Sequence, residues 1–383
     1  MADEGYRQHY IRKGDGIGGW ELLPAQYRMI WGPSDGCLMP YGIAWMDNGE
    51  TILLAGMQDQ GEYRCVYALS GDEGASWSDM SDTGSYGRPL TFGYLGGGNL
   101  VFGNELLGKP EDQKRKLRLS FSSDYGRSWN ERVYPMQTQD GRGSNTTEGT
   151  VFAEQVDGAT RICHLSVSLD PKQWDRLPSR VYMRWSNDLG SSWHGENCPQ
   201  EWLFEETCGG KRVPRGVSEG SLVRAQNGWL VAALRTDLPT RYWDVPHDDS
   251  LEGVGVSISK DNGTSWSPIN VLYDAGRHHP NLILMPNGDL VMTLIVRADV
   301  VGGELASYRR GSDALVSHDN GASWNLQQQY VLDAYEFSDS KEWYNGECGH
   351  LGSTRLSDGS ILTVYGNYLS GNAALIKWRP SGG

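Results

Sequence analysis

The octapeptide SGDEGASW at residues 70–77 returns four more times along the chain, and this repeat decides the fold. The other copies are SSDYGRSW at 122–129, SNDLGSSW at 186–193, SKDNGTSW at 259–266 and SHDNGASW at 317–324. All five agree at Ser, Asp, Gly, Ser and Trp, and successive copies start 52, 64, 73 and 58 residues apart. We interpret the pattern as a hairpin turn. Its Asp side chain would bond backbone amides, its Gly would take a positive φ and its Trp would pack back onto the sheet.

A second repeat alternates with the first and consists of an apolar strand, a glycine turn and another apolar strand. It occurs six times, with its turn glycines at Gly49, Gly98, Gly158, Gly228, Gly288 and Gly359. Six hairpins and five octapeptides predict an all-β chain, a six-bladed β-propeller whose blades are four-stranded meanders. We expect residues 1–383 to form one domain. An N-terminal strand around Gln8 to Arg12 would complete the last blade.

Composition narrows the function classes. The 383 residues include 50 Gly, 15 Trp and 19 Tyr, and the formal net charge is −14. Such an acidic balance argues against nucleic acid or an anionic membrane as the main partner. No apolar run approaches the roughly 20 residues of a membrane span, and the start MADEGYRQHY lacks a secretory signal. We therefore expect a chain that is either cytoplasmic or secreted with its signal removed.

The six cysteines show no zinc-binding spacing, and nothing in the sequence indicates a metal or another cofactor. Isolated buried thiols are favoured over a bridge between Cys198 and Cys208.

The octapeptides are Asp boxes, and the chain resembles the sialidase superfamily of six-bladed propellers from about Leu38 to its C-terminus. Propellers with Asp boxes include sialidases, other glycosidases, polysaccharide lyases and non-enzymatic receptors. The resemblance therefore implies a carbohydrate ligand.

Candidate site residues stand at one register. The inner strand of each blade lines the channel, and its entry end opens onto the ligand face. Nine residues before the turn glycine, the chain has Pro40, Glu219, His279 and His350. In the second and third blades the same place lies beside Arg88 and Glu148.

Glu219 and Glu148 are the leading pair because glycoside hydrolysis needs two carboxyl groups in one cleft. The resemblance implies more for Glu219. In the segment SEGSLVRAQNGWLVAALR it precedes Arg235 by sixteen residues, as a sialidase Glu precedes an Arg that grips the substrate carboxylate. In sialidases this Glu polarises a nucleophilic Tyr. Asp59 loosely matches the sialidase acid/base Asp, and Arg297 is a candidate second guanidinium for an acidic sugar.

Two departures disfavour ordinary sialic acid hydrolysis. Leu38-Met39-Pro40 stands where sialidases have Arg-Ile-Pro, and His350 stands where they have the nucleophilic Tyr. A neutral imidazole of His279 or His350, with His278 adjacent, suits a general base or a sugar-binding group. Aromatic side chains on or near the channel strands and top loops are candidates for stacking on sugar rings, above all Tyr41, Trp243 and Tyr365.

The leading hypothesis is an exo-acting glycoside hydrolase that removes a terminal sugar, acidic or strongly polar, from an oligo- or polysaccharide. One alternative is a lyase on uronic-acid glycans that uses His279 or His350 as base. The other is a propeller that binds glycans without cleaving them. The sequence leaves the oligomeric state open.

Overall fold

The computed structural model describes residues 5–31, 37–59, 62–105, 116–135, 143–146, 149–169, 178–243, 248–336, 349–367 and 372–381. In these ranges the chain is built of β-strands, with four short 3₁₀ segments at Gln200–Trp202, Thr240–Tyr242, Asp248–Leu251 and Leu326–Gln328. No helix among the described residues is long and apolar enough to cross a membrane. The all-β class predicted from the repeats is confirmed.

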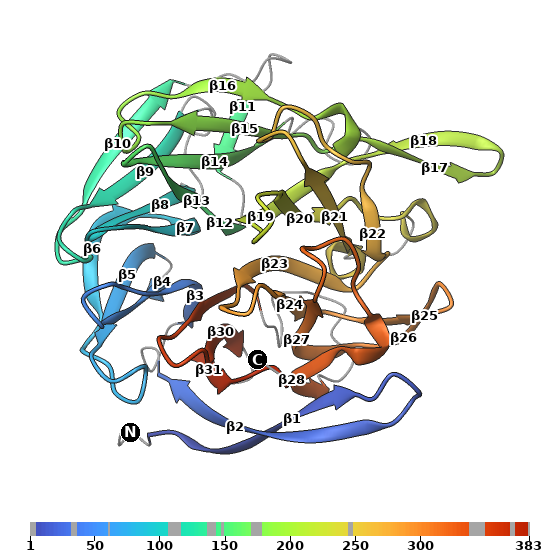
Figure 1. The fold of residues 1–383 in the computed structure, drawn as a ribbon, viewed down its shortest axis with the longest axis horizontal. Coiled ribbons are helices and arrows are strands. Elements are labelled where there is room, and N and C mark those ends of the chain that lie inside the picture. Colours follow the sequence, from blue (N-terminus) through green and yellow to red (C-terminus); the bar gives the residue numbers. More distant parts are fainter. Residues whose placement is uncertain are drawn as a thin grey trace.

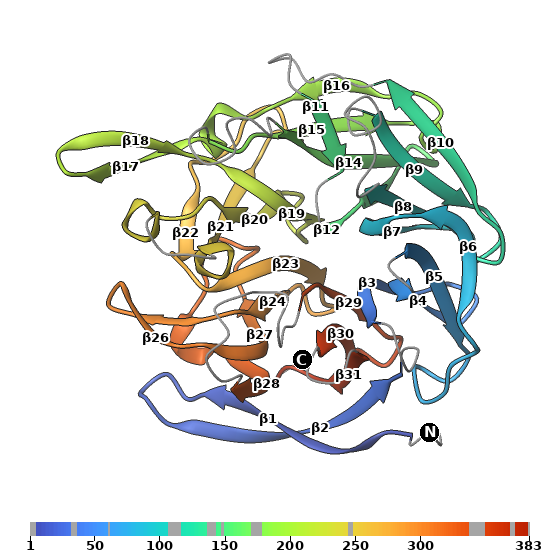
Figure 2. The same cartoon turned by 180° about the vertical axis from the view of Figure 1, so that it is seen from behind.

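The described strands group into antiparallel meanders placed around a central axis (Figures 1 and 2). The first meander contains β3 (Cys37–Trp45), β4 (Thr51–Asp59), β5 (Glu62–Ser70) and β6 (Ser81–Tyr86). The second contains β7 (Arg88–Gly96), β8 (Asn99–Glu105), β9 (Lys116–Ser122) and β10 (Asn130–Pro135). The third contains β13 (Phe152–Val156), β14 (Ala159–Leu169), β15 (Val181–Ser186) and β16 (His194–Asn197). The fourth contains β19 (Val217–Arg224), β20 (Leu230–Thr236), β21 (Gly253–Ser259) and β22 (Asn270–Tyr273). The fifth contains β23 (Arg277–Leu284), β24 (Leu290–Val296), β27 (Arg309–Ser317) and β28 (Tyr330–Glu336). The sixth contains β29 (Leu351–Arg355), β30 (Ile361–Asn367) and β31 (Asn372–Trp378).

Smaller elements complete the list. They are β11 (Gly143–Thr146), which pairs with β14, β12 (Gly149–Thr150), and the two hairpins β17 (Phe204–Cys208) with β18 (Lys211–Arg215) and β25 (Asp299–Val301) with β26 (Glu304–Ser307). Strand β12 runs parallel to both β7 and β19, with Gly149 opposite Thr91 on one side and Gly220 on the other. It thereby joins the inner strands of the second and fourth meanders close to the axis.

The N-terminal hairpin closes the ring. Strand β2 (Trp20–Ile30) pairs with β31 and becomes the fourth strand of the sixth meander. Strand β1 (Arg7–Gly14) pairs with β2 and, at its end, with β28 of the fifth meander. The segment Gln8 to Arg12, predicted to complete the last blade, therefore lies one strand further out. The reason is that the chain turns back at residues 15–19, which brings the second arm of the hairpin against the open edge of β31.

Each of the five octapeptides folds into the same type of turn, as predicted. In the first copy the amide of Gly74 donates to Ser70 Oγ at 2.8 Å, and the amide and hydroxyl of Ser76 donate to the two carboxylate oxygens of Asp72 at 2.7 and 2.6 Å. The same three bonds recur in the other copies. Each turn also places the residue before the glycine at positive φ, which the sequence did not indicate.

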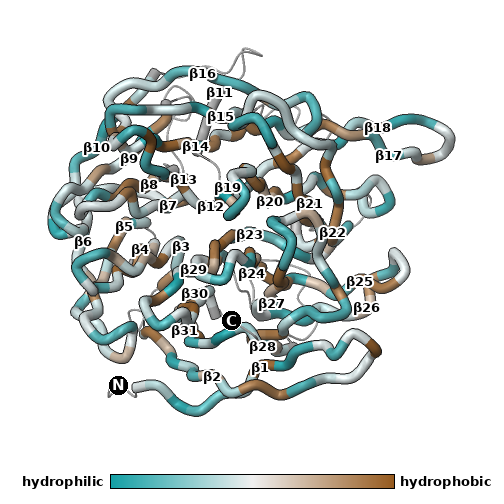
Figure 3. The backbone as a smooth tube through the Cα atoms, in the orientation of Figure 1, coloured by the Kyte–Doolittle hydropathy of each residue, from teal (hydrophilic) through white to brown (hydrophobic). Residues whose placement is uncertain are grey.

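These turns also connect neighbouring meanders. A methyl group built on Gly126, in the second meander, would lie 2.4 Å from Cδ1 of Ile52 in the first. The corresponding atom on Gly190 would lie 2.4 Å from the ring of Phe121 in the second meander. The glycine is thus required both by its φ and by close packing against the preceding meander. Between the meanders lie clusters of buried apolar side chains, and Figure 3 shows such apolar stretches within strands such as β21 and β24.

Candidate functional site

The candidate site lies where the inner strands begin. Glu219 is in β19, His279 is in β23, and His350 immediately precedes β29. These three side chains are 3–5% exposed, so the residues predicted from one sequence register are buried near the axis. Ion-pair and ring contacts connect all three side chains.

Glu219 is held from two sides. Its Oε1 forms an ion pair with Nη1 of Arg235, which lies on the adjacent strand β20. Its Oε2 lies 3.2 Å from Nδ1 of His279. The other terminal nitrogen of Arg235 contacts the carboxylate of Glu252. Arg235 is therefore clamped between two carboxylates, which fixes its guanidinium in position.

His279 is presented by an irregular piece of backbone. Its φ is +47°, in the left-handed region that residues other than glycine seldom adopt. The pairing of β23 with β24 shifts register between His278 and Asn281, which is the signature of a bulge, and Pro280 lies inside it. Because such a conformation costs free energy, the contacts of the His279 side chain must maintain it.

The second ring nitrogen of His279 is also engaged. Nη2 of Arg297 lies 3.2 Å from His279 Nε2 and donates to the carbonyl oxygen of Gly349 at 3.1 Å. A guanidinium only donates, so Nε2 must accept, and the ring proton then sits on Nδ1 and faces Glu219. The contacts thus select one neutral tautomer of His279.

Burial and neighbouring charge keep the three imidazoles neutral. For His279 the pKa is well below its ordinary value, first because the ring is desolvated and then because His350, Arg297 and Arg235 lie nearby. The pKa of His278 is lowered by the same kind of burial and by Arg297. For His350, burial and Arg88 lower the pKa, whereas the negative charge of Glu219 opposes them.

Contacts between rings hold the imidazole of His350 in place. The His350 ring packs against the ring of Tyr41 with 4.1 Å between centroids and against the ring of His279 at 4.5 Å. The Tyr41 hydroxyl donates to the sulfur of Met39 at 2.8 Å. Tyr41, predicted as a substrate-binding residue, is 4% exposed, and its ring packs against the ring of His350.

Several guanidinium groups lie around these side chains, namely those of Arg88, Arg235, Arg297 and Arg310. The carboxylates of Glu219 and Glu252 both contact Arg235. Arg297 and Arg310 are almost fully buried. Guanidinium groups in a desolvated place suit a ligand that carries a carboxylate or sulfate. No group of three or more His, Cys, Asp or Glu side chains in the described ranges is arranged to hold a metal ion.

Other predicted site residues lie elsewhere or outside the described ranges. Tyr365 is fully buried between the fifth and sixth meanders, where its hydroxyl bonds Asp333 of β28, so we do not assign it to the site. Trp243 is 46% exposed and follows the 3₁₀ turn Thr240–Tyr242. Asp59 ends strand β4, but its side chain is not described. Glu148 lies outside the described residues.

Two residues of the site were missed from the sequence. Glu252 directly precedes β21, and the pairing of Thr236 with Gly253 sets it beside Arg235. Arg310 lies on β27, the third strand of its meander. Only inner strands were searched at the chosen register, so neither residue could be found. A search of the strand ends next to Arg235 and Arg297 would have included both.

Three comparisons with known proteins complete the description. No protein-family model matches the sequence, and no curated protein matches it either. Among solved structures, a Dyadobacter fermentans protein of unknown function superposes with a TM-score of 0.66 at 15% identity, over 92% of this chain and 98% of the other. The Hadza microbial sialidase Hz136 superposes with a TM-score of 0.60 at 14% identity, over 89% of this chain and 65% of the sialidase.

The chain has the sialidase-like β-propeller fold. A Penicillium chrysogenum α-L-arabinanase, solved with arabinobiose, shares this propeller with a TM-score of 0.55 and 14% identity. The match covers 90% of this chain and 95% of the arabinanase. The resemblance inferred from the octapeptides is thereby confirmed for the fold, and the fold is one that glycoside hydrolases use.

Proposed function

We propose that this protein is a glycoside hydrolase that removes an anionic sugar from the end of a glycan. The observation that carries the proposal is the buried carboxylate of Glu219 at the start of an inner strand, held by Arg235 and His279. Sialidase and arabinanase neighbours support the hydrolase class. The guanidinium groups near this carboxylate are of the kind that binds a sugar carboxylate or sulfate.

Hydrolysis of a glycosidic bond requires a proton for the leaving oxygen and a carboxylate that faces the oxocarbenium-like transition state. We assign the second role to Glu219, because Arg235 and His279 hold its carboxylate in place. Asp59 and Glu148, predicted from the sequence, remain the candidate proton donors. His279 would orient Glu219, and His350 would contact the sugar.

We assign the anionic group of the sugar to Arg297, with Arg88 as a second contact. Arg235 is less suited to this role because both of its terminal nitrogens already bind carboxylates. Inner strands converge on the axis, so we propose that only a chain end enters and that cleavage is exo. Trp243, partly exposed, is a candidate platform for the sugar beyond the cleaved bond.

The test is a screen of aryl glycosides and oligosaccharides with acidic or neutral terminal sugars. Reducing ends and the ultraviolet absorbance of unsaturated uronates are followed in parallel. Wild type is compared with Glu219→Gln and with Glu205→Gln, a control carboxylate on β17 that is 54% exposed. We expect turnover of acidic substrates that falls about 100-fold or more in Glu219→Gln and is unchanged in the control.

Other outcomes would replace the proposal. Ultraviolet absorbance that persists in Glu219→Gln and disappears in His350→Ala would establish a lyase. The lone pair of His279 already accepts from Arg297, which makes this ring a poor candidate for the lyase base. Glycan binding without any turnover would establish a non-catalytic propeller. Preference for neutral terminal sugars would refute the assigned role of the arginines.

A further inference from the structure

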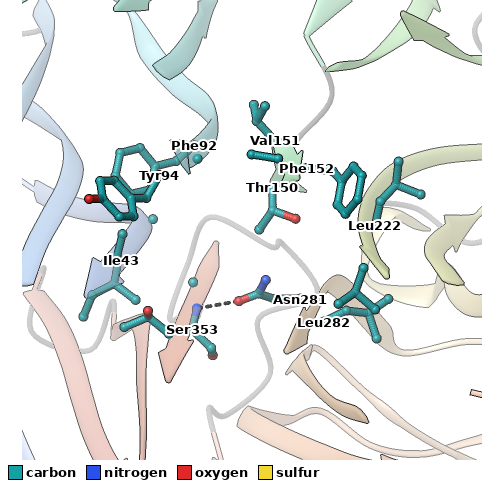
Figure 4. A pocket seen from close by; sticks show the side chains of 18 of the residues that line it. Ile43, Phe92, Tyr94, Thr150, Val151, Phe152, Leu222, Asn281, Leu282 and Ser353 are labelled. Atoms are coloured by element: carbon teal, nitrogen blue, oxygen red, sulfur yellow. Dashed lines mark hydrogen bonds between the residues drawn. The ribbon is translucent and has the colours of Figure 1, made fainter. Parts of the chain in front are cut away.

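The channel has a cavity at the end opposite the candidate site. About 420 Å³ in volume, it is lined by the later residues of the inner strands, such as Trp45 of β3 and Tyr94 of β7 (Figure 4). The residues of the candidate site stand at the starts of these strands. Tyr41 lines this cavity, and its ring packs against His350. Tyr41 therefore contacts both the cavity and the candidate site.

The charge of this cavity differs from that of the candidate site. Its charged lining residues are Glu154 and Arg224, and they bind each other through Arg224 Nε to Glu154 Oε2 at 2.5 Å and Arg224 Nη2 to Glu154 Oε1 at 3.1 Å. Burial raises the pKa of Glu154, but Arg224 and Arg161 outweigh it, and the pKa is lowered. Glu154 also binds Arg161, which is not among the lining residues, at 2.9 Å. The lining itself contains one negative and one positive side chain, and both are engaged in these ion pairs.

Polar groups in the wall are held in place by the meanders behind them. Oδ1 of Asn281 accepts from the backbone amide of Ser353 at 2.6 Å, which leaves the amide nitrogen of Asn281 facing the cavity (Figure 4). Asn281 is 4% exposed. The hydroxyl of Thr150 is fixed by Ser221 Oγ at 2.7 Å. Such groups are ordered before a ligand arrives, which lowers the entropic cost of binding.

Apolar surface supplies the rest of the wall. Phe92, Phe152 and Leu222 lie around the cavity in Figure 4, and Trp45 is another lining residue. Volumes of about 300–1,000 Å³ with apolar walls and a few fixed polar groups are typical of small-molecule sites. A neutral pyranose matches this cavity because the sugar has apolar ring faces, several hydroxyls and no charge.

We propose that this cavity binds a neutral sugar, at a site distinct from the one that cleaves the glycan. The site comprises the Asn281 amide, the Thr150 hydroxyl and the aromatic walls. It does not depend on Glu219 or Arg297. The protein would then have two glycan-binding ends, one selective for negatively charged sugars and the other for neutral sugars.

The test is saturation-transfer NMR with methyl glycosides of neutral hexoses, and with glucuronate as the charged counterpart. Asn281→Asp keeps the acceptor for Ser353 but removes the donor, and Ala153→Trp places a ring across the lining. Asn130→Asp, an exposed position on β10, is the matched control. Arg297→Ala reports on the candidate site. Thermal unfolding of each variant checks that it is folded.

We expect a neutral methyl hexoside to bind wild type, Asn130→Asp and Arg297→Ala alike, and to bind both cavity variants about tenfold more weakly. The proposal is overturned if no neutral sugar binds wild type at about 10 mM, or if both folded cavity variants bind as wild type does. Loss of binding in Arg297→Ala alone would place the sugar in the candidate site and also overturn it.

Discussion

Asp313 offers the sharpest test of how the candidate site is supported. It is fully buried on β27, and its carboxylate binds Arg277 Nε at 3.1 Å and Arg309 Nη1 and Nη2 at 3.0 and 2.8 Å. Arg277 begins β23 two residues before His279. The second carboxylate on the same two arginines is Asp299, whose side chain is 28% exposed.

The substitution Asp313→Asn keeps the size of the side chain and removes its charge. Arg277, which is buried, and Arg309, whose side chain is 13% exposed, would then share Asp299 alone. Breaking a buried pair from one side costs about 3–5 kcal/mol. With an unfolding entropy of about 2.1 cal/mol/K per residue, 383 residues give about 0.8 kcal/mol/K. The melting temperature should therefore fall by about 4–6 °C. Asp299→Asn, where solvent replaces part of the loss, should cost about 1–2 kcal/mol.

Differential scanning calorimetry at neutral pH measures both variants beside wild type. A shift of about 1 °C or less in Asp313→Asn would refute the reasoning, as would equal shifts in the two variants. Either result would mean that burial does not decide the strength of these pairs.

Three further predictions follow from the same structure. Gly126→Ala, with its φ of +83° and Ile52 at 2.4 Å, should lower the free energy of unfolding by about 2–4 kcal/mol, whereas Gly49→Ala, at the same φ with open space, should cost about 1 kcal/mol. Urea titrations compare the two, and equal midpoints would rule out the packing against Ile52. Cys208 is exposed, so Cys208→Ser should remove one rapidly reacting thiol in a titration with an aromatic disulfide, and an unchanged count would contradict its exposure. The pKa of Asp299 is lowered to about 2 because its bonds to Arg309 and Arg277 outweigh desolvation. Its stabilisation is therefore complete above pH 4, the ordinary carboxyl range, and is lost as the pH falls towards 2. Melting temperatures across this range should fall less steeply in Asp299→Asn than in wild type.

The sequence alone predicted the all-β class and its repeated turn, but not which N-terminal strand pairs with β31. Five octapeptides and six glycine turns are local patterns, since each Asp, Ser and Gly acts within eight residues of its partners. Such short-range bonds fold the same way in every copy, so repetition reveals both the turn and the all-β class. The prediction that Cys198 and Cys208 are not bridged agrees with the structure, but neither thiol is buried, because Cys198 is partly exposed and Cys208 is exposed.

Tertiary structure decided the site. Glu219, His279 and His350 occupy the same register position in their blades, and they lie together because equivalent inner strands begin at equivalent positions around the axis. Tyr365 has the right chemistry, yet it packs against the neighbouring fifth meander and bonds Asp333 there. Contacts between strands far apart in the chain set which nitrogen of His279 carries the proton and which carboxylate clamps Arg235. Spacing along a chain shows which residues share a face, but only packing between blades shows which atoms meet.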